Sequence, residues 1–231
     1  MLVTIIIIFF LFTWITISAV NADSSVELKF NFDEQDDSLI PFAVVLDVET
    51  TGLINSEGAP TKKKLSDWDE GYPRIVQIAW ITISRDYKAV KKKSYLIKQD
   101  KPIPKASIDI HGITDEKVAN GSDLKEVLLE FKADIEECEY YVGHNVQFDK
   151  YVIEAEFIRS SLLKPFRGKK KYDTMIMGKS IVGRKFFKLQ DLAKATFPKK
   201  QYETINFHDA EEDVYVTGAL FCALHKSNIK Y

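Results

Sequence analysis

Two acidic residues end a short apolar segment near the start of the chain. The segment PFAVVLDVET, residues 41–50, is rich in β-branched side chains and predicts a buried strand. Asp47 and Glu49 lie two positions apart, so on a strand both carboxylates point to the same face. Two carboxylates on one face repel each other unless a cation offsets the cost, and Mg²⁺ takes oxygen ligands of this kind. The pair is therefore a candidate metal site, although an ordinary strand end also fits it.

The residues that follow the acidic pair are typical of a turn that approaches a ligand. Thr50, Thr51 and Gly52 come directly after it. A glycine permits a tight turn and a close approach of backbone to ligand. Backbone N–H groups in such a turn can contact a phosphate.

A third acid lies at the start of a predicted helix. In VGHNVQFDKYVIEAEF a strand ends at Gly143, a turn begins at Asn145, and Asp149 falls about one helical turn into the segment that follows. If the strand that ends at Gly143 lies next to the strand that holds Asp47, Asp149 can face the same cleft as Asp47. The alternative is an ordinary first-turn aspartate that the helix dipole favours.

The segment HDAEEDVYVTGALF supplies a histidine and a fourth acid. His208 precedes a helix, and Asp213 follows five residues later beside apolar helix positions. An imidazole with a pKa of ~6.5 has a neutral fraction that can accept a proton near neutral pH. The alternative is a helix cap and a solvated face. Four carboxylates in one cleft would instead bind two divalent cations, and such a pair ~3.5–4 Å apart activates water and stabilises the leaving oxygen of a phosphodiester.

Four segments in sequence order resemble one enzyme family. LDVETTGL, IDIHGIT, GHNVQFDKYVIEAEF and HDAEED are similar to motifs of the DEDDh (DnaQ-like) 3′–5′ exonucleases, within the ribonuclease H-like superfamily, and the resemblance covers about residues 42–224. It implies an α/β fold with a mixed five-stranded sheet of order 3-2-1-4-5 flanked by helices. It also implies hydrolysis of terminal phosphodiesters to nucleoside 5′-monophosphates with two divalent cations, Mg²⁺ or Mn²⁺.

The resemblance assigns roles to individual residues. The metal-binding carboxylates match Asp47, Glu49, Asp149 and Asp213, and the general base matches His208, whose H-x4-D spacing is that of the histidine branch of the family.

Substrate contacts are also implied by the resemblance. The turn that holds the terminal nucleotide matches Thr50, Thr51, Gly52 and Leu53. Leu53 would wedge against the last base, and plain packing is the alternative. His111 in HGIT and Asn145 in GHN match positions near the pocket, while His111 equally fits a cap of its own turn.

The remaining pattern predicts the elements that position these residues. Segments 75–84 and 87–97 predict a hairpin with its turn at Arg85-Asp86. Short turns or half-helices follow over 101–120, then a helix capped by Ser122 or Asp123. A short strand, a helix from Val146, another short strand and further helices lead to a last long helix over about 209–226. A hairpin joined to βα units predicts a mixed sheet with helices on its faces.

The segment 53–74 is rich in glycine, proline and charge and predicts a long loop. It contains Trp68 near the basic run Lys62–Lys64. An aromatic side chain beside basic ones suits contact with a nucleic-acid single strand. The alternative is a solvated surface loop.

The composition is that of an ordinary globular protein, with 45% hydrophobic and 29% charged residues among 231. The net charge of −2 argues against a dominant, sequence-blind electrostatic grip on nucleic acid. Residues 23–40 hold six acids and one lysine, so the rest of the chain is mildly basic. Cys138 and Cys222 have no metal-site spacing, and Cys222 lies in an apolar run that predicts a buried thiol.

Residues 1–22 carry no charged side chain, and residues 2–20 form an apolar run with Thr13, Thr16 and Ser18 as mild polar breaks. That length fits a signal-like segment or a membrane anchor, although no Lys or Arg precedes it. A buried element or an extension without a role also fits. The predicted organisation is therefore an apolar segment 1–22, an acidic linker 23–40 and an exonuclease domain 41–231. The segment favours an anchored or exported protein with membrane contact, whereas the family resemblance favours the cytoplasm.

The expected partner is the 3′ end of DNA, single-stranded or frayed, with DNA favoured over RNA, and a polymerase is a further possible partner. Two alternatives remain open at this point. One is an exoribonuclease that trims RNA 3′ ends, because no residue here settles how the pocket treats a 2′-hydroxyl. The other is a non-catalytic nucleic-acid-binding or polymerase accessory module that keeps the fold.

Overall fold

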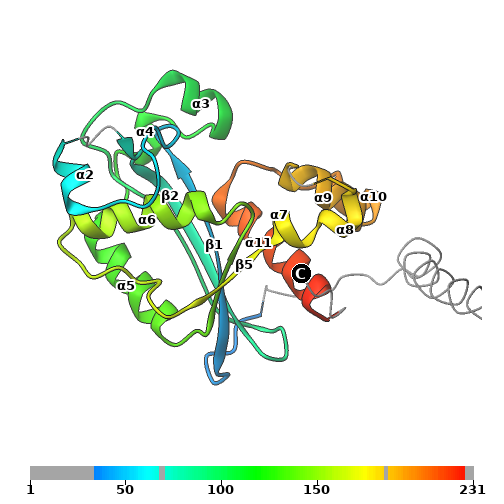
Figure 1. The fold of residues 1–231 in the computed structure, drawn as a ribbon. Helices are drawn as coiled ribbons and strands as arrows, with labels where there is room; N and C mark the ends of the chain where they lie inside the picture. Colours follow the sequence, from blue (N-terminus) through cyan, green and yellow to red (C-terminus); the bar gives the residue numbers. More distant parts are fainter. Residues whose placement is uncertain (1–33, 68–70, 185–186, 227–231) are drawn as a thin grey trace, which may run out of the picture.

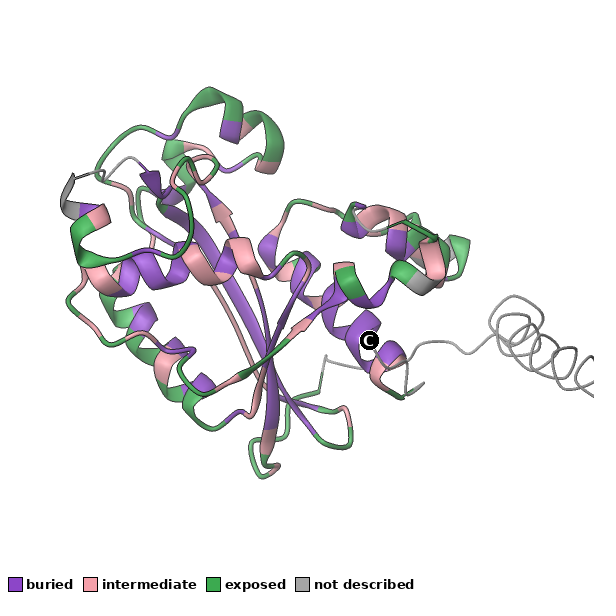
Figure 2. Cartoon of the chain, in the orientation of Figure 1, coloured by how far each residue is buried: buried purple, intermediate pink, exposed green. Residues whose placement is uncertain are grey.

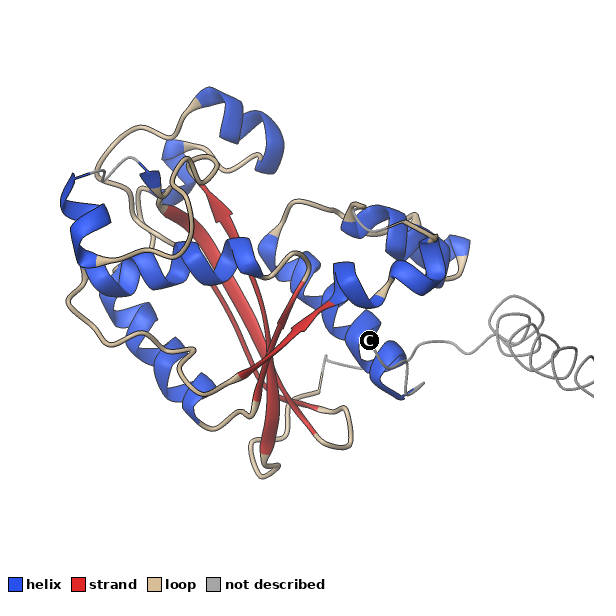
Figure 3. Ribbon diagram, in the orientation of Figure 1, coloured by secondary structure: helices blue, strands red, loops and turns tan. Residues whose placement is uncertain are grey.

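A mixed five-stranded sheet forms the centre of the molecule (Figure 3). The computed structural model describes residues 34–67, 71–184 and 187–226. The strands are β1 (Pro41–Thr50), β2 (Ile75–Ser84), β3 (Ala89–Leu96), β4 (Tyr140–Gly143) and β5 (Lys170–Asp173), in the order β3-β2-β1-β4-β5. The β1–β2 and β2–β3 pairs are antiparallel, whereas β1–β4 and β4–β5 are parallel. The predicted mixed sheet and its order are confirmed.

Long helices bury both faces of this sheet (Figures 1 and 2). Val44, Leu46 and Val48 of β1 pack in one core with residues of α5 (Leu124–Glu136) and α6 (Gln147–Arg159). Ala43 and Val45 pack in a second core with α11 (Ala210–Lys226). Successive strand residues alternate between faces, so burial on both sides explains why β1 reads as a continuous apolar run.

Shorter helices surround the cores, and most were predicted. They are α3 (Lys105–His111), α4 (Asp115–Val118), α7 (Thr174–Met177), α8 (Lys179–Val182), α9 (Leu189–Thr196) and α10 (Lys199–Tyr202). Of the two candidate caps for α5, Asp123 is the one that accepts a hydrogen bond, from the N–H of Glu126 at 3.1 Å. Both cysteines are buried, and burial raises the pKa of each thiol to about 12. The prediction of a buried Cys222 thiol is therefore confirmed.

The segment predicted as one long loop contains a helix, α2 (Lys62–Asp67), and is fixed to α6. Leu65 and Tyr72 pack against Ala155. The sequence did not predict these apolar contacts because charged residues and glycines surround Leu65 and Tyr72 in this segment. Arg159 donates a hydrogen bond to the carbonyl of Tyr72 at 2.7 Å, and Lys164 donates one to the carbonyl of Pro60 at 2.8 Å. Trp68, for which a nucleic-acid contact was predicted, lies outside the described residues.

A fully buried glutamate on α6 holds the end of this segment. The Oε1 atom of Glu156 accepts from Arg74 at 2.7 Å and lies 3.1 Å from the Arg159 guanidinium. Replacement by alanine leaves the largely buried guanidinium of Arg159 without its carboxylate, so we expect Glu156→Ala to lower the free energy of unfolding by about 3 kcal/mol. Chemical denaturation of the variant measures this loss.

An exposed glutamate provides the matched control for that measurement. Glu139 also pairs with two cations, Arg85 and Lys170, but its side chain is 38% exposed. Exposed ion pairs contribute little, so Glu139→Ala should unfold close to the wild type. Equal losses in the two variants would contradict the role given to Glu156.

The start of the chain is only partly described. Within the described residues, none of the helices has the length and apolar character needed to cross a membrane. The apolar segment 1–22 and most of the predicted linker 23–40 lie outside the described residues. At the end of that linker, the N–H of Asp36 donates to the carbonyl of Ala89 on β3 at 3.2 Å. The predicted division at residues 22 and 40 stays a prediction.

Candidate active site

The first acidic pair lies at the end of the central strand. Asp47 and Glu49 flank Val48, whose side chain packs in the core under α5 and α6. Since side chains alternate along a strand, both carboxylates point to the opposite face, which α11 covers. The predicted placement on one face is therefore found in the structure.

Asp149 meets this strand end from α6. It lies in the first turn of the helix, is buried, and accepts a hydrogen bond from the N–H of Val48 at 3.1 Å. The pairing of β4 with β1 runs only from Ala43 to Val45, so Asp149 supplies an acceptor further along β1. The buried aspartate thus lies beside the backbone between Asp47 and Glu49.

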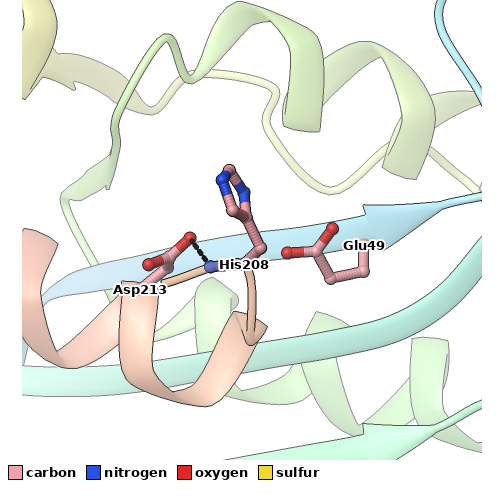
Figure 4. A group of neighbouring side chains, drawn as sticks. All are labelled: Glu49, His208 and Asp213. Carbon is pink, nitrogen blue, oxygen red and sulfur yellow. Dashed lines mark hydrogen bonds between the residues drawn. The ribbon is translucent and has the colours of Figure 1, made fainter. Parts of the chain in front are cut away.

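His208 and Asp213 reach the same place from the start of α11. The N–H of His208 donates to Oδ2 of Asp213 at 3.3 Å, and the buried Oδ1 of Asp213 has no hydrogen-bond partner among the described residues. Ligand atoms of Glu49, His208 and Asp213 all lie within 4.8 Å of one another. Figure 4 shows His208 between the two carboxylates. Residues far apart in sequence therefore form one group.

Crowding of the acids changes their proton affinity. Burial, followed by the negative charges of Asp149 and Asp213, raises the pKa of Asp47 well above its usual value. Burial also raises the pKa of Glu49 to about 8, and the pKa values of Asp149 and Asp213 to about 7. Buried carboxylates that repel each other, one with an unpartnered oxygen, fit a hard divalent cation.

These raised pKa values predict a pH dependence for the metal-free protein. A carboxyl whose pKa is higher in the folded state favours folding while it is protonated, so its contribution is complete below the unfolded pKa of about 4. That contribution is lost as the pH rises through about 7 for Asp149 and Asp213 and about 8 for Glu49. In EDTA we expect the melting temperature to fall between pH 5 and pH 9. Added Mg²⁺ should reduce the fall, and an equal fall with and without Mg²⁺ would contradict a cation site here.

The turn after the acidic pair is fixed by hydrogen bonds. Thr50 Oγ1 donates to the carbonyl of Gly52 at 2.7 Å. The N–H of Thr51 donates to the carbonyl of Arg74 at 3.0 Å, and Thr51 Oγ1 accepts from the Arg74 N–H at 2.9 Å. Leu53 is 75% exposed, which rules out the packing alternative. Its contact with a base stays a prediction.

Gly52 does not need to be glycine for the turn to form. Its φ is not in the left-handed region, and an added Cβ would meet nothing within 4 Å. The turn that glycine permits is present, but other residue types could also adopt this conformation. A close approach by a ligand stays a prediction.

The two other predicted substrate residues are His111 and Asn145, which lie on separate turns. His111 ends α3, and its Nδ1 accepts from the N–H of Ile113 at 3.0 Å, which supports the capping alternative. Its Nε2 is buried without a hydrogen-bond partner among the described residues. Asn145 has an exposed side chain and a φ of 59°, and its N–H donates to Asp173 Oδ1 at 3.0 Å. Substrate contact by either residue stays a prediction.

Three residues at this site were not found from the sequence. Asp173 accepts from the N–H groups of Asn145 and Met175, and so fixes the turn before α6. Asp209 lies beside His208, and its charge contributes to the raised pKa of Asp47. Gln77 lies buried on β2 and contacts the start of α11. A polar residue inside the apolar run IVQIAW was the signal for Gln77, since buried polar groups need partners.

Comparison with known proteins points in one direction. A model of the RNase T exonuclease family matches residues 44–221. The DNA polymerase III subunit epsilon of Haemophilus influenzae is 36% identical over 119 residues, which span 52% of this chain and 42% of that relative. A structure of Exonuclease X in complex with 5′ overhanging duplex DNA has a TM-score of 0.57 at 22% identity. The aligned region covers 82% of this chain and 95% of the Exonuclease X chain. Escherichia coli Exonuclease I in complex with a dA16 oligonucleotide has a TM-score of 0.60 at 19% identity. The aligned region covers 80% of this chain and 40% of the Exonuclease I chain.

Proposed function

The chain belongs to the exonuclease family whose model it matches, and from that membership we propose that it is a metal-dependent 3′–5′ exonuclease. It would hydrolyse terminal phosphodiesters of DNA, at single-stranded or frayed 3′ ends, and release nucleoside 5′-monophosphates. The observation that carries the proposal is the group formed by Glu49, His208 and Asp213, whose ligand atoms lie within 4.8 Å of one another. An acid pair alone fits an ordinary strand end, but a basic imidazole beside converging buried acids supports hydrolysis.

We propose that four carboxylates hold the cations, Asp47, Glu49, Asp149 and Asp213. Their oxygen ligands favour Mg²⁺ or Mn²⁺. When bound, a pair of such ions activates water and stabilises the leaving oxygen of the scissile bond. Support comes from the burial and mutual repulsion that raise the pKa of Asp47 and from the unpartnered Oδ1 of Asp213.

We assign the general base and the substrate contacts to other residues of the site. His208 accepts the proton of the attacking water on an imidazole nitrogen, because it faces the acids and is exposed enough to exchange that proton with solvent. The turn Thr50–Leu53 would hold the terminal nucleotide. Leu53 presents an exposed apolar side chain to the last base, while Thr51 is fixed by Arg74 and keeps the turn in place. His111 and Asn145 would line the same pocket.

A degradation panel tests this proposal directly. Single-stranded DNA, duplex DNA with a frayed or recessed 3′ end, and RNA of the same sequence are incubated with the wild type, with Mg²⁺ and with EDTA. We expect metal-dependent degradation with DNA preferred, a preference suggested by the DNA complexes of the two structural relatives. Faster degradation of RNA would favour the exoribonuclease alternative, and binding without degradation would favour an accessory module.

The organisation and partners of the whole protein are proposals as well. We propose that residues 41–231 form the exonuclease domain, preceded by the acidic linker 23–40 and the apolar segment 1–22. The Haemophilus relative is named as a polymerase subunit, which suggests a polymerase as a partner of this chain. Copurification with a replicative polymerase would support that partner, and a single species at the mass of the free chain would argue against it.

A further inference from the structure

Gln77 is a buried amide that faces the candidate active site from β2. It is the cross-strand partner of Glu49 in the antiparallel β1–β2 pair. Side chains of directly opposite residues project from the same face, so the amide lies beside the Glu49 carboxylate. The residue is 7% exposed in a strand that is buried throughout. A buried amide at such a place needs hydrogen-bond partners on both its oxygen and its nitrogen.

Both ends of this amide bind the start of α11. Gln77 Nε2 donates to Asp209 Oδ1 at 3.3 Å, and Gln77 Oε1 accepts from the N–H of Ala210 at 3.2 Å. Asp209 is itself part of the first turn, because its Oδ1 accepts from the N–H of Glu211 at 3.0 Å. Its carbonyl accepts from the N–H of Asp213 at 2.8 Å. One side chain of β2 therefore fixes the backbone between His208 and Asp213.

The backbone at this point needs such support. His208 has a φ of 67°, in the left-handed region that non-glycine residues rarely adopt. A strained conformation of this kind persists only when its surroundings hold it. Two sets of hydrogen bonds hold this backbone. The N–H of His208 donates to Asp213, and the Gln77 amide bonds to the next two residues, Asp209 and Ala210.

We propose that Gln77 is a positioning residue for the exonuclease reaction, which fixes His208 and Asp213 of α11 relative to Glu49 of β1. The inference rests on the proposed function. Gln77 acts through Asp209 and Ala210, the two residues that its amide contacts. Because reaction rates depend steeply on the placement of reacting groups, with a displacement of about 1 Å able to cost about 10²-fold, a loosened α11 turn should slow the chemical step. Hydrogen bonds in the turn Thr50–Leu53 do not involve Gln77, so substrate affinity should change little.

Two variants of Gln77 test this role against a merely structural one. Gln77→Leu removes both hydrogen bonds, and Gln77→Asn keeps an amide that is one methylene too short to span both partners. For each we expect kcat on single-stranded DNA to fall about 10- to 100-fold, with KM within about threefold of the wild type. The fall in kcat is read together with the melting temperature. General loss of structure would lower the active fraction, and with it kcat, along with the melting temperature, whereas loss of positioning lowers kcat in protein that stays folded.

Thr82→Val is the matched control. Thr82 is buried on the same strand, away from the site, and its Oγ1 accepts from the N–H of Lys91 at 3.1 Å. This variant also loses a side-chain hydrogen bond of a buried residue, but it should keep the kcat of the wild type.

A double-variant experiment tests whether Gln77 acts through Asp209. Since Gln77 acts through the α11 turn, the double variant Gln77→Asn/Asp209→Ala should lose no more kcat than the more damaging single variant. An active wild type together with kcat values within twofold for both Gln77 variants would overturn the inference. So would an equal loss in Thr82→Val. A wild type that degrades no DNA would instead overturn the proposed function, and the inference with it.

Discussion

Asp47→Asn should abolish nucleotide release and, in the absence of divalent ions, make the protein more stable at pH 8. The substitution removes a proposed cation ligand that is crowded by Asp149 and Asp213. Cation catalysis contributes several kcal/mol, and each 1.36 kcal/mol is tenfold, so we expect a loss of at least about 10³-fold in kcat. The neutral amide also avoids the burial cost and the repulsion that together raise the pKa of Asp47, which explains the gain in stability.

Opposite effects on activity and stability make this prediction specific. Kinetics with Mg²⁺ and thermal unfolding in EDTA measure the two effects on the same preparation. Asp86→Asn is the matched control, because Asp86 is exposed in the β2–β3 turn at the other end of the sheet. It should change neither quantity. Full activity of Asp47→Asn, or a lower melting temperature at pH 8, would contradict the site.

His208→Ala should reduce kcat by about 10² to 10⁴-fold, which is the usual contribution of a general base. The affinity for Mn²⁺, measured by calorimetric titration, should change far less than kcat. Mn²⁺ affinity must be measured separately from kcat, because a ligand atom of His208 lies within 4.8 Å of those of Glu49 and Asp213, so His208 could itself bind the metal. A parallel loss of Mn²⁺ affinity and turnover would assign His208 to the cation, and an unchanged rate would remove it from the reaction.

The fold was largely predictable because local patterns and a family resemblance agreed. The alternation around Asp47 and Glu49 predicted their common face, and the hairpin turn at Arg85-Asp86 predicted the antiparallel edge of the sheet. The site followed from motif order, which placed Asp149 and Asp213 in the first turns of helices that meet β1, with His208 just before the second of them.

Other features could not be predicted, since they depend on contacts between distant segments. Periodicity indicates that Gln77 is buried but not that its amide binds Asp209, which lies 132 positions away. Composition made residues 53–74 look like a loop, whereas Leu65 and Tyr72 pack on α6. The turn at Gly52 was assigned from its residue type, but nothing in the conformation found requires glycine there.

The most direct test of the central claim is an end-labelling experiment with the wild-type protein. A single-stranded DNA oligonucleotide labelled at its 3′ end is compared with the same oligonucleotide labelled at its 5′ end, in Mg²⁺ and in EDTA. In Mg²⁺, the 3′ label should be released first as a mononucleotide, while the 5′-labelled strand shortens one nucleotide at a time; in EDTA, neither strand should change. Release of the 5′ label first, cleavage to internal fragments, or degradation that persists in EDTA would contradict a metal-dependent 3′–5′ exonuclease.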